Sequence, residues 1–400
     1  MAAAGREQSG AFVMLPLALS LPLPTVYGRL LGVSSWKVGS MKRLLRTLLA
    51  VSLVAASLSS GTAAARQPDD TRSEHQKTVD FWTADKVRQA IPRDFVFHPA
   101  SGRFIPAARG GNPGPPGGGG GGGGGDSTTT TGTHWTGEGT VVESTGKVLF
   151  SLGTNAQGED LYWVCSASVV ADGEVGRSLA VTAAHCVYEN AGGGEFAQNW
   201  MYIPNYEEVA KNLHILNDNT QVCTSAPNGC WTANALVLHD GFASAGGFNG
   251  TAIQYDFAFA VIGDGGKTNS LVEGLGTQGI AFDSVSKGAS TFSFGYPHDF
   301  ATFNHDLTYC AGGLNFDNRF FKLTYKLKCD MTGGASGGPW FSPFTEGTGA
   351  GTVMSVNSYR YSGGDALYGP KFNANTAAIF GAAKLTAGNC IEPTTCPAQP

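Results

Sequence analysis

The stretch that decides the fold is Cys329–Trp340, which reads CDMTGGASGGPW. It sets Ser336 among four glycines and closes with a proline. A serine in this setting is either a nucleophile held on a tight turn or the middle of a flexible loop. The stretch alone does not separate the two, so the choice depends on which histidine and which carboxylate the rest of the chain supplies, and in which order.

Chain order excludes one reading of the serine motif. Gly334-x-Ser336-x-Gly338 also fits the nucleophile elbow of α/β-hydrolases, but there the histidine follows the serine. Residues 337–400 contain no histidine. The remaining arrangement is the chymotrypsin order of histidine, aspartate and serine, which requires both partners upstream of Ser336.

One histidine has the setting that catalysis needs. The run LAVTAAHCVY, residues 179–188, brings His185 in at the end of an apolar strand, after small residues that leave room around the imidazole. The other seven histidines lie in the polar N-terminal region or in loop-like stretches: His75, His98, His134, His214, His239, His298 and His305.

The candidate carboxylate is Asp256, which interrupts an apolar run in IQYDFAFAVIGDGG, residues 253–266. Burying a carboxylate is costly unless it accepts hydrogen bonds or faces a cation, and a histidine Nδ1–H meets that need. Other upstream aspartates stand in turn-like sequence, where solvated turn residues are the ordinary interpretation. These are Asp218, Asp240 and Asp264.

Composition favours an exported β protein. The 400 residues are 42% hydrophobic and 14% charged, so the chain can bury a sizeable core. A net charge of −5, with no basic run beyond the N-terminal region, argues against an electrostatic grip on nucleic acid. Fifty-seven glycines and short Val, Thr, Phe and Tyr runs predict an all-β fold. Eight cysteines, all after residue 164, indicate disulfides and an extracellular location.

The chain changes character several times before it becomes globular. From Met41 a basic start, an apolar stretch and Ala63-x-Ala65 are typical of a signal peptide, so Met41 is the expected start. A membrane anchor in residues 11–31 is the alternative, which three prolines weaken. We expect an upstream extension (1–40), a signal peptide (41–65), a pro-segment (66–109) with a helix in TADKVRQAI, a Gly/Pro-rich linker (110–133), and a globular domain with a C-terminal tail (134–400).

Three ordered blocks resemble one known family. VTAAHC, YDFAFAVI and GGASGGP are similar to the catalytic blocks of chymotrypsin-like serine peptidases, and FWTADKVRQAIP, residues 81–92, resembles the pro-segment start of secreted trypsin-like members from bacteria and fungi. The resemblance covers roughly residues 135–385 and implies two packed antiparallel six-stranded β-barrels with the active site between them and a short C-terminal helix. It also implies a Cys165–Cys186 disulfide. Short separations favour Cys223–Cys230 and Cys390–Cys396, which leaves Cys310–Cys329.

The resemblance implies a secreted, monomeric serine endopeptidase that acts on proteins or peptides. Ser336 would attack the scissile carbonyl, His185 would take and return the proton, and Asp256 would orient the imidazole. The backbone N–H groups of Gly334 and Ser336 would bind the oxyanion. No cofactor, metal, nucleic acid or stable membrane association is expected. The alternative is a catalytically silent relative that binds other molecules through the same barrels.

Specificity and activation stay open. Ala335 replaces the aspartate that digestive members use as an activation switch, so the pro-segment would act differently, by covering the cleft or by assisting folding. Asp330 stands where trypsin-like members bind Arg or Lys, but Thr332 replaces their pocket cysteine, and D-x-x-G-G-x-S-G also resembles acid-preferring glutamyl endopeptidases. We slightly favour an Asp330 that turns into its own loop. Ser355, Val356 and Asn357 are expected to form the substrate-pairing strand.

Overall fold

A computed structural model describes residues 72–106, 129–173, 178–262, 276–298 and 306–396, all within the compact unit Asp70–Pro400. The expected upstream extension, the signal peptide and most of the linker lie outside the described residues. No helix in the described ranges combines the length and apolar character that a membrane span requires.

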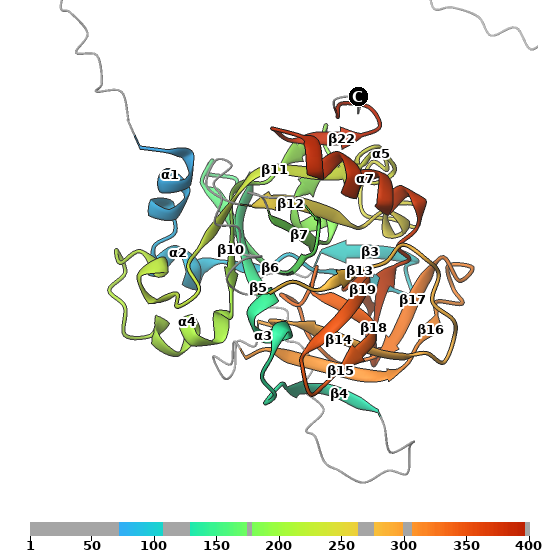
Figure 1. Ribbon diagram of the computed structural model, residues 1–400. Helices are drawn as coiled ribbons and strands as arrows, with labels where there is room; N and C mark the ends of the chain where they lie inside the picture. Colours follow the sequence, from blue (N-terminus) through green and yellow to red (C-terminus); the bar gives the residue numbers. More distant parts are fainter. Residues whose placement is uncertain (1–71, 107–128, 174–177, 263–275, 299–305, 397–400) are drawn as a thin grey trace, which may run out of the picture. The chain divides into compact units, whose positions relative to one another are not determined.

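Six antiparallel strands close into the first barrel. They pair in the order β6, β5, β10, β11, β12 and β7, and β7 pairs back with β6 (Figure 1). Apolar runs such as AFAVI in β12 are buried along their whole length, because closure leaves one face inside the barrel while neighbouring elements cover the other. The strands are β5 (Thr145–Thr154), β6 (Asp160–Val170), β7 (Ser178–Thr182), β10 (Gln198–Pro204), β11 (Trp231–His239) and β12 (Ala258–Ile262).

The second barrel is built from two six-stranded sheets that share one continuous stretch of chain. Nine of the strands follow one another after the first barrel, and three come from the N-terminal segment described in the next paragraph. β19 belongs to one sheet and β20 to the other, and the chain passes between them at Asn357 and Ser358. A disulfide between Cys310 and Cys329 joins β15 to the end of β17, although these strands lie in different sheets. The strands are β13 (Gly279–Ile280), β14 (Ser290–Gly295), β15 (Thr308–Gly313), β16 (Asn315–Phe316), β17 (Thr324–Lys328), β18 (Pro339–Thr345), β19 (Ala350–Val356), β20 (Tyr359–Tyr361) and β21 (Ala366–Pro370).

The segment expected as a pro-segment forms part of both barrels' sheets. β1 (Ile91–Pro92) pairs with β6 of the first barrel, and β2 (Phe95–His98) pairs with β20 of the second. β3 (Arg103–Pro106) pairs with β2. β4 (Thr130–His134) pairs with β15, so the folded domain includes four residues that the sequence assigned to the linker.

Helices are few and lie at the edges of the sheets. The expected helix after Thr83 is present as α2 (Ala84–Gln89), capped by the Thr83 side chain, but it ends before Ile91 because that residue starts β1. The short C-terminal helix is α7 (Ala374–Leu385), which packs on β11 and β12 (Figure 1). The others are α1 (Glu74–Phe81), α3 (Thr140–Ser144), α4 (Tyr206–Leu213), α5 (Asp240–Ala243) and the 3₁₀ turns η1 (Ala184–Cys186), η2 (Val222–Ser225) and η3 (Ala252–Gln254). Short strands β8 (Tyr188–Glu189) and β9 (Glu195–Phe196) pair together, and β22 (Cys390–Glu392) pairs with β11.

All four expected disulfides are present. Cys165–Cys186 joins β6 to η1, and Cys310–Cys329 lies near the start of the Ser336 loop. The two short-range bridges, Cys223–Cys230 and Cys390–Cys396, also form as the sequence separations predicted. The mostly β architecture with a closed six-stranded antiparallel barrel and few helices confirms the expected fold class, while the second half differs in having two six-stranded sheets that include parallel pairs.

Candidate active site

His185 and Asp256 form a buried pair at the junction of the barrels. His185 lies in η1, directly after β7, and Asp256 lies between η3 and β12, which pairs with β7. The Asp256 Oδ2 atom is 2.8 Å from His185 Nδ1, and its Oδ1 atom accepts the His185 backbone N–H at 2.8 Å. Both side chains are fully buried. The carboxylate therefore requires a proton on Nδ1 and leaves the Nε2 lone pair as the basic site of a neutral imidazole.

A third group holds the same carboxylate. The Ser358 hydroxyl donates to Asp256 Oδ2 at 2.5 Å, from the chain between β19 and β20. Asp256 thus accepts three hydrogen bonds, which offset the cost of burying its charge. Ser358 was not among the residues expected at the site, because only the turn between β19 and β20 brings its hydroxyl to Asp256.

The loop that carries Ser336 packs directly against the chain leading to His185. The Ser166 backbone N–H of β6 donates to the Ser336 carbonyl at 2.7 Å. Gly337, with φ +82°, lies so close to Thr182 and Ala183 that a Cβ would meet the Thr182 hydroxyl at 2.1 Å. Only glycine fits this position, and its fit brings the nucleophile's loop against the end of β7.

Two backbone donors lie on this loop. Gly334 has φ +96°, a conformation that side chains rarely adopt, and the Ser166 hydroxyl donates to its carbonyl at 2.9 Å. Within the described part of the chain, neither the Gly334 nor the Ser336 backbone N–H donates to a backbone carbonyl. Two backbone N–H groups without a backbone acceptor, held on a fixed turn, can donate hydrogen bonds to an oxyanion.

The imidazole is covered rather than open. His185 Nε2 has no hydrogen-bond partner among the described residues, and the ring is enclosed by Phe95 at 5.4 Å and Phe248 at 5.6 Å between ring centroids. These two phenylalanines stack on each other at 4.1 Å. Ser336 is only 4% exposed. Ser336 Oγ therefore does not hydrogen-bond to Nε2 in this covered state, and a buried basic nitrogen without a partner is costly for stability.

Four consecutive residues of the N-terminal segment make this cover. Pro92 lies against Gly333, whose hypothetical Cβ would be 2.8 Å from the proline Cβ. Arg93 donates to the His185 carbonyl at 2.6 Å and pairs with Glu189 at 3.0 Å, and burial lowers the pKa of its guanidinium. Asp94 is followed by Phe95, whose ring closes over the imidazole. The segment therefore crosses the site from β6 to β20.

Asp330 does not face a cation. Its Oδ1 atom lies against Gly132 of β4, where an added Cβ would be 1.9 Å away. Burial, with the nearby Asp365 charge, raises the pKa of Asp330, while its own backbone N–H lowers it. Within the described ranges no Lys or Arg forms an ion pair with it. The carboxylate thus lies against β4, and which side chain the primary pocket prefers stays a prediction.

The expected substrate-pairing residues lie at the end of β19 and at the turn that follows it. Ser355, Val356 and Asn357 are buried in the second barrel. The Asn357 backbone already bonds Gly337 and Gly338, and the Ser355 hydroxyl donates to Pro370. The strand that pairs with the covering segment is β20, which runs parallel to β2. The substrate-pairing role of Ser355, Val356 and Asn357 stays a prediction.

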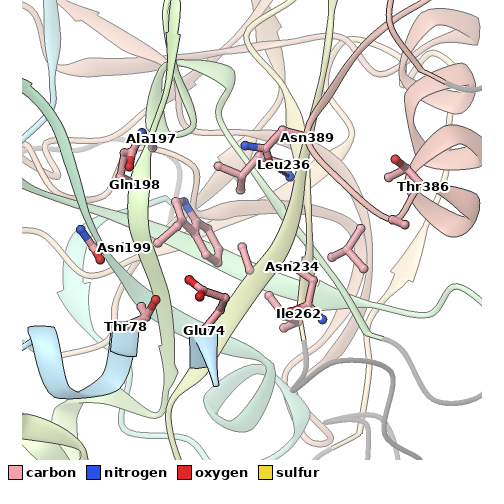
Figure 2. A pocket seen from close by; sticks show the side chains of 14 residues that line it. Glu74, Thr78, Ala197, Gln198, Asn199, Asn234, Leu236, Ile262, Thr386 and Asn389 are labelled. Atoms are coloured by element: carbon pink, nitrogen blue, oxygen red, sulfur yellow. Dashed lines mark hydrogen bonds between the residues drawn. The ribbon is translucent and has the colours of Figure 1, made fainter. Parts of the chain in front are cut away.

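One pocket opens beside the site, and another lies away from it on the first barrel. One of about 320 Å³ lies between Pro92–Phe95 and residues including Trp163, Glu189 and Phe248, so it opens beside the covered imidazole. Another of about 620 Å³ lies on the first barrel, where Figure 2 shows Glu74 and Thr78 of α1 facing Asn199 and Asn234. None of His185, Asp256 and Ser336 lines this second pocket.

Among the residues that the structure describes, two clusters have metal-ligand residue types. Cys165 and Cys186 beside His185 are joined in a disulfide, so they offer no thiolate. His134, Glu207 and Asp306 lie at the surface, where His134 and Glu207 form an ion pair at 3.1 Å. Exposed pairs of this kind contribute little.

Comparison with known proteins finds similar chains among the solved structures. No family model matches the sequence, and no curated protein matches it. Among solved structures, the protease Anisep from Arthrobacter nicotinovorans is 32% identical over 62% of this chain and 99% of its own, with a TM-score of 0.49. The thermostable serine protease AL20 from an extremophilic microorganism is 29% identical over 62% and 99%, with a TM-score of 0.49. A scabies mite inactivated protease paralogue is 16% identical over 64% and 100%, with a TM-score of 0.41.

The ordered sequence blocks, the two barrels and the buried His185–Asp256 pair at their junction agree with the 32% identity over nearly all of Anisep. The chain belongs to the chymotrypsin-like serine peptidases.

Proposed function

We propose that this chain is a secreted serine endopeptidase that cleaves protein or peptide substrates through an acyl-enzyme intermediate. The observation that carries the proposal is the His185 imidazole, whose Nδ1 pairs with buried Asp256 while its Nε2 has no partner among the described residues. Nε2 is then the general base for Ser336, and the Asp256 charge stabilises the imidazolium that forms.

The Ser336 loop supplies the rest of the chemistry. As the serine oxygen bonds the scissile carbonyl carbon, the carbonyl oxygen becomes negative and the Gly334 and Ser336 amides stabilise it. His185 then delivers its proton to the leaving amine, and a water molecule takes the place of that amine in the second half of the reaction. Four disulfides agree with export from the cell.

The full chain is proposed to be latent. Residues 91–98 lie across the site, and the Phe95 ring closes over the imidazole that a substrate must approach. The pro-segment therefore inhibits by covering the cleft, which agrees with the absence of an aspartate before Ser336. Phe95→Ala in the full chain should increase the rate at which a fluorophosphonate labels Ser336, because the cover loses its central ring.

Labelling separates this proposal from the silent binding protein. A fluorophosphonate bonds an activated serine, so peptide mapping of the labelled full chain should place the adduct on Ser336. Ser342→Ala, six residues further along the same chain, is the matched control and should label like the parent. A Phe95→Ala chain that takes up no label on Ser336 would favour the silent alternative.

A further inference from the structure

The cover places one acidic side chain in an unusual position. Asp94 is only 6% exposed, and burying a carboxylate is costly unless a cation pairs with it. Its partner is Arg360 of β20, whose Nε donates to Asp94 Oδ2 at 3.1 Å. Within the described ranges this is the one ion pair that either residue forms.

The ion pair lies beside the reacting groups. Arg360 is two residues after Ser358, whose hydroxyl holds Asp256. On the other side, a Cβ added to Gly333 would be 3.2 Å from both Asp94 Cβ and Asp94 Oδ2. Gly333 directly precedes Gly334, one of the two amides that face the developing oxyanion. The carboxylate of Asp94 therefore occupies the space between the oxyanion loop and β20.

When Asp94 leaves the space between the oxyanion loop and β20, Arg360 remains there as a positive charge. Arg360 is 28% exposed at its side chain, so its guanidinium lies at the mouth of the space rather than in open solvent. Asp330, the residue expected to attract a basic side chain, lies against Gly132 instead. A lysine or arginine of a substrate entering here would meet Arg360, whereas a carboxylate would replace the partner that Arg360 loses when the cover leaves.

We propose that the enzyme cleaves preferentially after acidic residues, that Arg360 selects the acidic side chain, and that Asp94 imitates that side chain in the full chain. This specificity rests on the proposed peptidase function. The Arg360 guanidinium acts on binding of the residue that precedes the scissile bond and has no part in proton transfer.

The cover gives the first test. In the full chain, Asp94→Asn and Arg360→Gln should each increase the rate of fluorophosphonate labelling, and the double variant should label no faster than the quicker single variant, because both remove the same contact. Lys328→Gln removes a positive charge from an exposed position at the end of β17 and serves as the charge-matched control. Fully additive effects of Asp94→Asn and Arg360→Gln would overturn the pairing.

The second test measures selection directly. Two peptides that differ only by Glu or Gln before the cleaved bond are given to the full chain carrying Asp94→Asn and Phe95→Ala, in which the ring no longer closes over the imidazole. The expected preference for Glu is roughly tenfold to 100-fold in kcat/KM, the range for one hydrogen-bonded charge. Adding Arg360→Gln should remove it, and adding Arg360→Glu should shift cleavage toward Lys.

The outcomes distinguish the two proposals. Ser336-dependent cleavage without a preference for Glu, or a preference that survives Arg360→Gln, overturns the acidic specificity alone. A chain that cleaves no peptide and takes up no fluorophosphonate overturns the peptidase function and the specificity together.

Discussion

Replacing Ser358 by alanine tests how the carboxylate is held. The Ser358 hydroxyl touches Asp256, not the space where a substrate would lie, so the expected loss is in kcat and not in KM. The imidazole gains its positive charge during the reaction, and a less firmly oriented carboxylate stabilises that charge less well.

The magnitude follows from the hydrogen bonds that remain. Buried Asp256 accepts three hydrogen bonds, two from His185 and one from Ser358, and the variant removes one of them. A hydrogen bond to a charged group contributes about 1.5–3 kcal/mol, and each 1.4 kcal/mol is a factor of ten in rate. We expect kcat to fall roughly tenfold to 150-fold.

The assay compares Ser358→Ala with Ser355→Ala in a Phe95→Ala chain. Ser355 is equally buried, but its hydroxyl donates to Pro370 and touches none of His185, Asp256 and Ser336. Its loss should cost about 1 kcal/mol of folding stability with no change in kcat of the folded enzyme. Equal kcat values for the two variants, or a Ser358→Ala effect confined to KM, would refute the positioning argument.

Three further outcomes are expected. Replacing Cys165 and Cys186 by serine should lower the free energy of unfolding by about 3 kcal/mol, the loop-closure value for their separation of 21 residues, as chemical denaturation would measure; an unchanged midpoint would contradict this. Burial lowers the pKa of Lys147 to about 7, below its unfolded value of 10.5, so its contribution to stability is present above pH 10.5 and is lost as pH falls to about 7. Lys147→Met should therefore stabilise the protein more at pH 7 than at pH 10, and equal gains at both would refute the assignment. Asp330→Ser should leave cleavage specificity unchanged in a mixed-peptide digest, and a strong Arg/Lys preference that disappears in the variant would contradict that.

Local patterns carried much of the fold. Apolar runs such as LAVT and AFAVI predicted buried strands, Thr83 predicted the cap of α2, and cysteine spacing with the family resemblance predicted the four disulfides. Chain order singled out His185, Asp256 and Ser336 as candidates, because the chymotrypsin arrangement places the histidine and the aspartate upstream of the serine.

What the sequence missed depends on contacts between distant segments. Two serines stand three residues apart in SVNS, and only the turn from β19 to β20 decides that Ser358 and not Ser355 reaches Asp256. Likewise, Asp94 and Arg360 are 266 residues apart, so nothing local joins them. The strand FVFH that follows Pro92 was also not expected, because the sequence predicts a polar pro-segment with one helix there.

The central claim is that Ser336 is an activated nucleophile in a peptidase. Casein hydrolysis by the Phe95→Ala full chain, compared with the same chain carrying Ser336→Ala, tests it most directly. Because nucleophile and base act as a unit, the account predicts a loss of roughly 10⁴-fold or more in kcat. Casein hydrolysis that is unchanged in the Ser336→Ala chain would contradict it.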